Sequence, residues 1–250
     1  MRTDLHFHLL PGLDDGPAQL DDSVELARAA AAEGTRAIVA TPHVRHDYVT
    51  DVNIVPALVR EVQRELDSSG IGITVECGGE LGADMVGVLG QEELETIAVG
   101  PRGRRWLLLE TPFGGIDQRF HDAAEELRDR GFAVVLAHPE RCVSLFEDDS
   151  LGLRRELARG ALLQVNGGSI AGVHGPAPQE AALRLIGCGL VAAIASDAHS
   201  QERLPMLENA YLAMLENGIH PARAAHLTDC APGRLLRKGI PAHKPVPVAA

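Results

Sequence analysis

Two kinds of hydrophobic pattern alternate along the chain. Short runs of mostly apolar residues predict strands, and they lie at 4–8, 37–41, 73–77, 106–110, 133–137, 162–166 and 191–195. Between and after them, apolar residues recur every three or four positions, which predicts helices. These helical segments lie at 20–33, 54–66, 91–95, 120–130, 151–159, 179–186, 206–217, 222–226 and 232–237.

Most of the predicted strands are apolar throughout, which is typical of parallel strands buried on both faces of an α/β fold. Such strands form either an open doubly wound sheet or a closed barrel. We favour the barrel because histidines and carboxylates follow nearly every strand, and only closure brings all the strand ends together. No linker divides the sequence, so we expect one domain over 1–240 and a loose C-terminal tail over 241–250.

The 250-residue chain has a formal net charge of −12 at pH 7. This charge argues against a general binder of nucleic acid or of anionic membranes, because either needs a basic face. It does not exclude an anionic substrate, since bound metal ions reverse the sign of the local potential.

The four cysteines are scattered and form no Cys-x-x-Cys pair, which favours a reducing compartment. The N-terminus begins directly with the first strand and has no secretory signal pattern. No apolar run approaches the roughly 20 residues needed to cross a bilayer. We therefore expect a cytoplasmic protein without membrane insertion.

Side chains that bind metals gather at the predicted strand ends. His6 and His8 stand two apart, so both imidazoles point to one face of a strand, and Asp197 and His199 repeat this spacing near the far end of the chain. The full candidate set is His6, His8, Asp15, His43, Glu80, Glu110, His138, Asp197 and His199. This mixture of imidazole and carboxylate suits Zn, Mn or Fe. Because nine ligands are too many for one ion, we expect two or three ions bridged by a carboxylate.

Each candidate also has a structural explanation when taken alone. His43 and His138 could be hydrogen-bonded core histidines, and Glu80 could belong to a turn after two glycines. Asp15 is the weakest member, because Asp14-Asp15-Gly16 is also good turn chemistry. The remaining histidines are expected to be solvated or structural, with His46 the nearest to an exception because it follows His43 in the same loop.

In order, the motifs resemble the polymerase and histidinol phosphatase (PHP) superfamily. They are His-x-His with Leu-Pro-Gly-Leu-Asp-Asp-Gly, then Ala-Thr-Pro-His, Gly-Gly-Glu, Leu-Leu-Leu-Glu, Ala-His-Pro-Glu-Arg and Ala-Ser-Asp-Ala-His. The first motif, Ala-His-Pro-Glu-Arg at 137–141 and Gln-Val-Asn-Gly-Gly-Ser at 164–169 are similar to one branch. That branch is the bacterial manganese-dependent protein-tyrosine phosphatases of capsular and exopolysaccharide synthesis.

This resemblance implies the PHP fold, a distorted TIM-like (β/α)7 barrel with a trinuclear metal cluster at its C-terminal face. It implies that the candidate set supplies the ligands, with Asp15 as a ligand or a close neighbour of the ligands. Mn²⁺ is the implied metal, with Fe or Zn as alternatives. Arg141 matches a phosphate-holding arginine of the family, and Arg203 is a second candidate in the loop after Asp-x-His. Surface ion pairs with Glu140 and Glu202 are the alternative for these two arginines.

The sequence thus predicts a metal-dependent phosphatase that hydrolyses phosphotyrosine through a metal-bridged hydroxide. Its expected partner is a phosphotyrosine protein, namely a bacterial tyrosine kinase of polysaccharide synthesis. Two alternatives stay open: a small-molecule phosphomonoesterase such as histidinol phosphatase, and a non-catalytic metal-binding module. A cysteine phosphatase is excluded because it needs Arg six positions after its Cys, and those positions hold Ala83, Asp148, Ile194 and Leu236.

Overall fold

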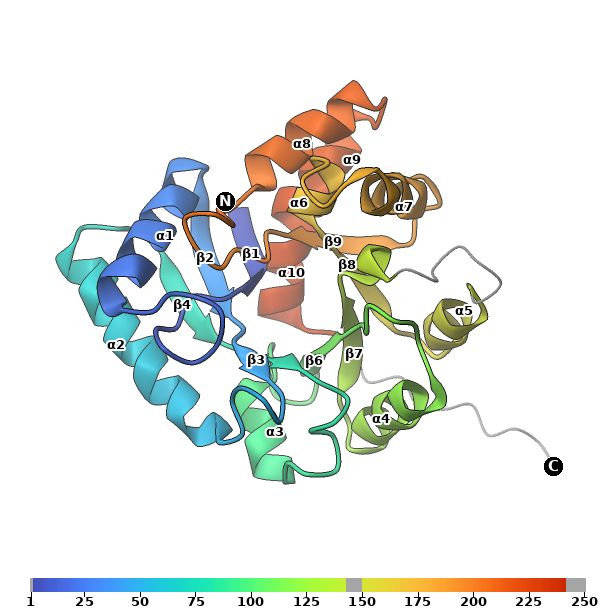
Figure 1. Ribbon diagram of the computed structural model, residues 1–250, viewed down its shortest axis with the longest axis horizontal. Coiled ribbons are helices and arrows are strands. Elements are labelled where there is room, and N and C mark those ends of the chain that lie inside the picture. Colours follow the sequence, from blue (N-terminus) through green and yellow to red (C-terminus); the bar gives the residue numbers. More distant parts are fainter. Residues whose placement is uncertain (1, 143–149, 242–250) are drawn as a thin grey trace.

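Parallel strands alternate with helices along the chain, and the helices lie outside the strands (Figure 1). The structure is a computed structural model that describes residues 2–142 and 150–241, so residues 242–250 of the predicted tail lie outside it. The strands are β1 (Arg2–Phe7), β2 (Thr35–Ala40), β3 (His43–Val44), β4 (Thr74–Cys77), β5 (Glu80–Leu81), β6 (Trp106–Glu110), β7 (Ala133–Ala137), β8 (Leu162–Asn166) and β9 (Val191–Ala195).

All nine predicted helical segments form. The α-helices are α1 (Leu20–Ala32), α2 (Val55–Ser68), α3 (Gln91–Ile97), α4 (Gln118–Asp129), α5 (Ser150–Ala158), α6 (Gly167–Ile170), α7 (Pro176–Gly187), α8 (Leu207–Glu216), α9 (Pro221–Ala225) and α10 (Ala231–Lys238). The starts of α1 and α3 are where the sequence predicted them, and α4 begins two residues earlier, after its cap Asp117. The start of α7 lies three residues earlier than predicted, because Pro176 fits the first turn of a helix, where its missing N–H is not needed. The one-turn helix α6 was not predicted.

Two of the predicted strands continue as short second pieces that the apolar pattern did not show. Thr41-Pro42 separates β2 from β3, and Gly78-Gly79 separates β4 from β5. Gly78 has no room for a side chain, since an added Cβ would lie 2.5 Å from the Val39 side chain. After these breaks β3 pairs with β5, and the register places His43 directly opposite Glu80.

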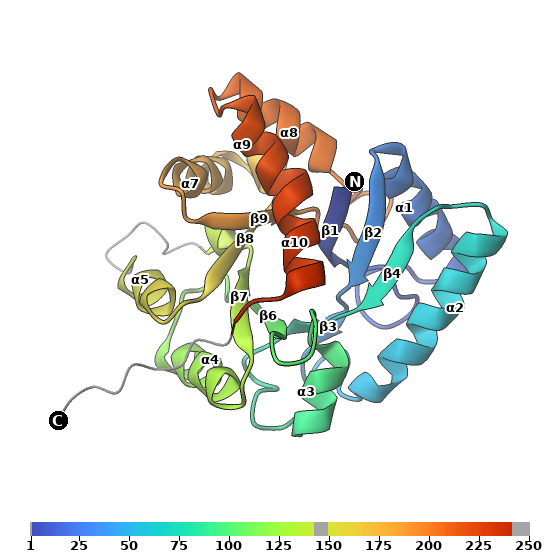
Figure 2. The ribbon, with the colours of Figure 1, turned by 180° about the vertical axis from the view of Figure 1, so that it is seen from behind.

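The parallel strands form two sheets, in the orders β1-β2-β4 and β3-β5-β6-β7-β8-β9. The first and last strands then meet. Phe7 pairs with Ala198 in a parallel bridge, and the Asp197 N–H donates to the His6 carbonyl at 2.9 Å. The result is an α/β TIM-like barrel of the predicted class, and α10, which lies in front in Figure 2, packs against β1 and β9.

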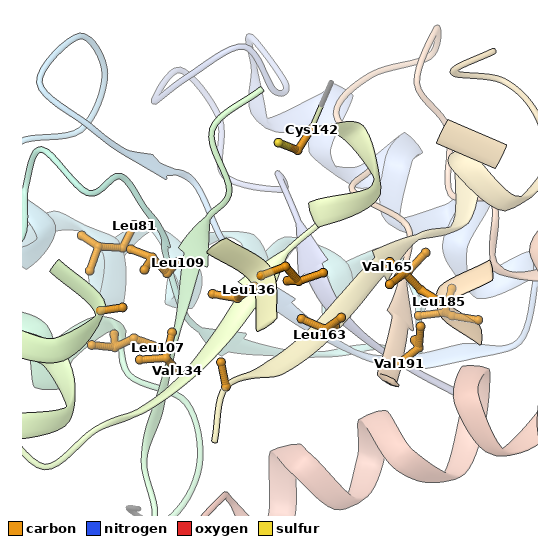
Figure 3. Close-up of a cluster of buried hydrophobic side chains, with 14 of the residues drawn as sticks. Leu81, Leu107, Leu109, Val134, Leu136, Cys142, Leu163, Val165, Leu185 and Val191 are labelled. Carbon is orange, nitrogen blue, oxygen red and sulfur yellow. The ribbon is translucent and has the colours of Figure 1, made fainter. Parts of the chain in front are cut away.

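In most strands the side chains on both faces are buried, as the apolar runs predicted, whereas Thr74 and Glu76 of β4 are exposed. Leu107 and Leu109 of β6 point outward and pack with Val134, Leu136 and their neighbours against the helices (Figure 3). Trp106 and Leu108 belong to a second cluster inside the barrel, with Leu5, Val39, Val135 and Ala193. This inner cluster fills the barrel, so the strand ends form its upper surface. Among the helices of residues 2–142 and 150–241, we find none long and apolar enough to cross a membrane.

Candidate metal centre

The nine candidate residues come together at the carboxyl ends of the strands. Eight of them fall into three groups whose potential ligand atoms lie within 4.8 Å of one another. The ninth, His138, places its Nε2 atom 2.7 Å from the Glu80 Oε1 atom. Each pair of groups shares one residue, so the set is continuous. The three groups are His6, His8, Glu80 and Asp197; His8, Asp15, His43 and His199; and His43, Glu80 and Glu110.

The first group is completely buried. The Nε2 atoms of His6 and His8 are 3.2 Å apart. Both also face Glu80 Oε2, at 3.2 and 3.3 Å, and Asp197 Oδ1, at 3.3 and 3.4 Å. These distances place two imidazole nitrogens and two carboxylate oxygens around one point.

The second group opens towards solvent. Asp15 Oδ1 lies 3.2 Å from His199 Nε2 and 3.4 Å from His43 Nε2, and the Asp15 side chain is 43% exposed. The weakest of the sequence candidates therefore does turn back towards the histidines. Glu110 closes the third group next to His43 and Glu80, and on its outer side it forms an ion pair with Arg45 at 3.2 Å.

Hydrogen bonds donated by Nδ1 fix the orientation of three imidazoles. His6 Nδ1 donates to Gln164 Oε1 at 3.0 Å, and His199 Nδ1 donates to the Asp197 carbonyl at 2.9 Å. His8 Nδ1 donates to Asp14 Oδ2 at 2.7 Å. Because all three partners are acceptors, the proton of each neutral ring lies on Nδ1 and the Nε2 lone pair faces the centre. Metal-binding histidines are held in this way in proteins.

The buried polar atoms of the centre lack other partners, which tests whether the residues fit a metal. Glu80 Oε2, His43 Nδ1 and His199 Nε2 are buried and form no hydrogen bond. Glu80 Oε2 and His43 Nδ1 are only 3.0 Å apart. Buried polar atoms without partners are costly, and the facing lone pairs of His6 and His8 repel unless a positive charge lies between them. Divalent cations satisfy both requirements, so the residues fit a metal cluster.

The charges of the centre are balanced among its own residues. Burial alone would raise the pKa of Glu80, but the His6 and His138 charges hold it well below its usual value. Burial opposes protonation of His138, yet Glu80 raises the pKa of His138 to about 9. Burial likewise opposes protonation of His8, but the neighbouring carboxylates of Asp14, Asp197 and Glu80 raise its pKa well above the usual value. Without metal, the site therefore holds protons where cations would sit.

Two residues of the centre have left-handed backbone conformations that non-glycine residues rarely adopt. His138 has φ 34° and Asp197 has φ 53°. His138 directly follows β7 and Asp197 comes two residues after the end of β9, and the reversal turns their side chains back over the barrel. Strained backbone of this kind is typical of functional sites.

Both predicted arginines reach the rim of the centre. Arg141 Nη1 lies 3.2 Å from Asp197 Oδ2, and Arg203 Nη2 lies 3.1 Å from the same oxygen. Arg203 also pairs with Asp15 at 3.4 Å. The arginines thus pair with residues of the centre. Glu140 is instead buried below Arg141, where it accepts hydrogen bonds from Ser169 and the Asn166 N–H.

Three polar residues of this region were not among the candidates. Asp14 and Gln164 orient His8 and His6, and Asn166 donates to Asp197 Oδ2 at 2.8 Å. Gln164 and Asn166 are polar residues at the end of a buried strand, a signal that could have identified them. Asp14 gave no such signal, because Asp14-Asp15-Gly16 is also typical of a turn. His46 is largely exposed and pairs with Asp84, outside the three groups.

Comparisons with known proteins agree with this geometry. The protein family described as "Capsular polysaccharide synthesis, CpsB/CapC" matches residues 2–237. The tyrosine-protein phosphatase YwqE of Bacillus subtilis is 31% identical over 98% of this chain and 96% of its own. The putative tyrosine-protein phosphatase CapC of Staphylococcus aureus is 31% identical over 82% of this chain and 80% of its own.

The chain is also similar in fold to solved structures. A structure from work on YwqE of Bacillus subtilis and CpsB of Streptococcus pneumoniae, described as metal-dependent tyrosine phosphatases, superposes with a TM-score of 0.80. It is 29% identical and covers 98% of this chain and 99% of the other. A lactonase of Listeria monocytogenes shares only the fold, with a TM-score of 0.57 and 14% identity over 94% of both chains. With the family match over nearly its whole length, the chain belongs to the CpsB/CapC family of capsular polysaccharide synthesis.

Proposed function

We propose that this protein is a metal-dependent tyrosine-protein phosphatase. The observation that carries the proposal is the convergence of nine histidines and carboxylates at one barrel end, with two arginines at their rim. A phosphate monoester needs neutralisation of its charge and a nucleophile opposite the leaving group. Bound divalent ions would supply Lewis acidity and an activated water at neutral pH.

The two carboxylate oxygens of Asp197 have different neighbours. Oδ1 faces His6 and His8 in the buried group, whereas Oδ2 accepts from Arg141, Arg203 and Asn166. Both guanidinium groups are therefore anchored by one edge at the side of the centre. Their other N–H groups are suited to bind the equatorial oxygens of a phosphate, because a guanidinium presents several donors in one plane.

We propose that the centre holds two or three ions and that Mn²⁺ is the native metal. The donor set supports a metal of intermediate hardness, because its ligand atoms are imidazole nitrogens and carboxylate oxygens without any cysteine. Fe and Zn accept the same ligands. The identity of the metal follows from metal analysis of protein purified without added metal, in which Mn is expected and a dominant content of Zn would contradict this part.

The proposed substrate is a phosphotyrosine segment of a bacterial tyrosine kinase, and we propose that residues 1–240 act as one domain in the cytoplasm. The names of the relatives and the exposed rim of the centre, where Asp15 and Arg203 reach solvent, support a protein substrate. Incubation of a phosphorylated kinase tail with the metal-loaded protein should release phosphate.

One comparison of substrates tests the function. Metal-loaded protein is given phosphotyrosine peptides and, separately, histidinol phosphate, and kcat/KM is measured for each. We expect clear preference for the peptides. Preference for histidinol phosphate would replace the proposal by a small-molecule phosphomonoesterase. Release of phosphate from neither, by protein whose metal content is verified, would support a non-catalytic module.

A further inference from the structure

Two aromatic side chains are exposed beside the metal centre. The chain holds only five Phe, two Tyr and one Trp. Trp106, Phe7 and Phe120 are fully buried, whereas Tyr48 is 40% and Phe113 is 46% exposed. Both rings therefore present apolar surface that a bound molecule can cover.

Each of these rings stacks on a histidine of the centre. Phe113 lies in the loop after β6, with its ring 5.9 Å from that of His138 and tilted by only 15°. Tyr48 lies in the loop after β3, with its ring 5.2 Å from that of His43 and tilted by 19°. The stacking holds both rings in place while their outer surfaces remain open.

Phe113 also contacts a phosphate-binding candidate. The Arg141 guanidinium carbon lies 4.7 Å from the centre of the Phe113 ring, within the range of a cation–π interaction. Arg45 lies 5.9 Å from the Tyr48 ring and forms an ion pair with Glu110. Both aromatic residues are thus attached to charged groups at the rim.

A cavity of about 350 Å³ lies beside Phe113, and Tyr48 stands outside its lining. Glu110 of the centre, Arg45 and Phe113 are among its lining residues, and the full lining is Arg45, His46, Gly82, Ala83, Asp84, Glu110, Pro112 and Phe113. Because Phe113 contacts Arg141 and also lines this cavity, a phosphate held by Arg141 would have the Phe113 ring and the cavity next to it, where its ester group can extend.

We propose that Phe113 and Tyr48 form an aryl subsite, which makes the centre prefer phosphate esters of phenols over those of aliphatic alcohols. The proposal rests on the proposed phosphatase function and assigns its selectivity to two residues. A flat ring attached to the phosphate gains stacking contacts with aromatic walls, whereas a short aliphatic ester does not. The two rings already lie parallel to fixed imidazoles, so they lose little freedom when a substrate binds.

The test compares phenyl phosphate with glycerol 2-phosphate, and a phosphotyrosine peptide with the same peptide carrying phosphoserine. The metal-loaded proteins are wild type, F113L, Y48L, the double variant and Y48F, with L212A as a control on the exposed face of α8. We expect the double variant to lower the aryl-to-alkyl ratio of kcat/KM about tenfold. Y48F, which keeps the ring, and L212A should leave that ratio unchanged.

Equal losses on both ester classes would overturn the proposal, because they would mean that Phe113 acts only by holding Arg141. An unchanged ratio in the double variant would overturn it as well. Binding of phenylphosphonate and methylphosphonate, measured by calorimetry on the same proteins, gives a second ratio that needs no turnover. If wild type hydrolyses no ester but prefers phenylphosphonate and the double variant does not, the function fails while the subsite stands.

Discussion

Replacing Asp14 by Asn should weaken metal binding although Asp14 is not itself a candidate ligand. Its Oδ2 atom accepts from His8 Nδ1 at 2.7 Å and from the His43 N–H at 2.8 Å, and its Oδ1 atom accepts from the Gly16 N–H at 2.9 Å. The side chain is 1% exposed. Asn keeps the shape of Asp but has only one acceptor oxygen. Its N–H₂ group must therefore face either the two donors that bind Oδ2 or the Gly16 N–H that binds Oδ1.

The size of the effect follows from these bonds. If the amide nitrogen takes the place of Oδ2, His8 must move its proton to Nε2 and can no longer bind a metal through that atom. If it takes the place of Oδ1, the Gly16 N–H loses its partner and the His8 bond loses its charge. A charge-assisted hydrogen bond exceeds a neutral one by about 1 kcal/mol. The bond from the His43 N–H is present with and without metal, so only the bond from the His8 imidazole counts towards metal binding. About 1 kcal/mol corresponds to about fivefold in the metal dissociation constant. The other placement of the amide, which moves the His8 proton to Nε2, would weaken binding more, towards the larger losses seen for outer partners of metal-binding histidines.

Calorimetric titration of metal-free protein with Mn²⁺ measures this change directly. Asp21 is an exposed carboxylate in the first turn of α1, so D21N is a control with the same chemical change. Phosphatase activity of D14N should return at high Mn²⁺ concentration, because the catalytic groups are intact. If D14N keeps its fold by circular dichroism and binds Mn²⁺ as tightly as wild type, His8 does not need the Asp14 carboxylate and the reasoning is refuted.

Four further predictions concern the same region. Q164L removes the acceptor for His6 Nδ1 and should weaken Mn²⁺ binding by about tenfold in calorimetry, whereas Q164E should not. R141A should lower kcat/KM for phosphotyrosine peptides by about 100-fold with an unchanged melting temperature; an unfolded variant would indicate a structural role. Chelation should abolish activity and lower the melting temperature, because the buried ligands lose their counter-charges; activity that survives complete metal removal would contradict the mechanism. Burial and the Arg141 charge lower the pKa of His174 to about 4. Between pH 6.5 and 4, His174 is therefore protonated in the unfolded chain but neutral in the folded protein, and stability falls as the pH falls. Urea unfolding of metal-free protein should therefore show a steeper loss of stability in this window for wild type than for H174N, and equal slopes would show that His174 titrates normally.

The sequence was sufficient for the strands because both of their faces are buried. β6, β7, β8 and β9 have the predicted ends, since each is mainly apolar and either ends in a polar residue or is followed by one. The candidate ligands could be recognised for the same reason. A carboxylate or histidine directly after such a run stands at the upper edge of the barrel, and parallel strands bring these edges together.

Other features of the fold and of the site depend on tertiary contacts that cannot be predicted from the hydrophobic periodicity of the sequence. The second pieces β3 and β5 have two residues each, too short for any pattern, and they form because Gly78 packs closely on Val39 and leads the chain to Glu80. Asp14 and Asp15 are identical in type and adjacent in sequence. Only the fold shows that Asp14 is buried beneath His8 while Asp15 reaches the open side of the centre.

The metal centre also lies across the closure of the barrel. Asp197 and His199 follow the last strand, His6 and His8 belong to the end of the first, and backbone bonds join Asp197 to His6 and His8 to Ala198. These residues are nearly 200 positions apart, so their contact forms only when the whole barrel has closed, and it is entropically expensive. Ligands from both chain segments would bind the same ions. Metal binding and barrel closure therefore stabilise each other, and this explains why a phosphatase site can be built on a seam held by so few backbone hydrogen bonds.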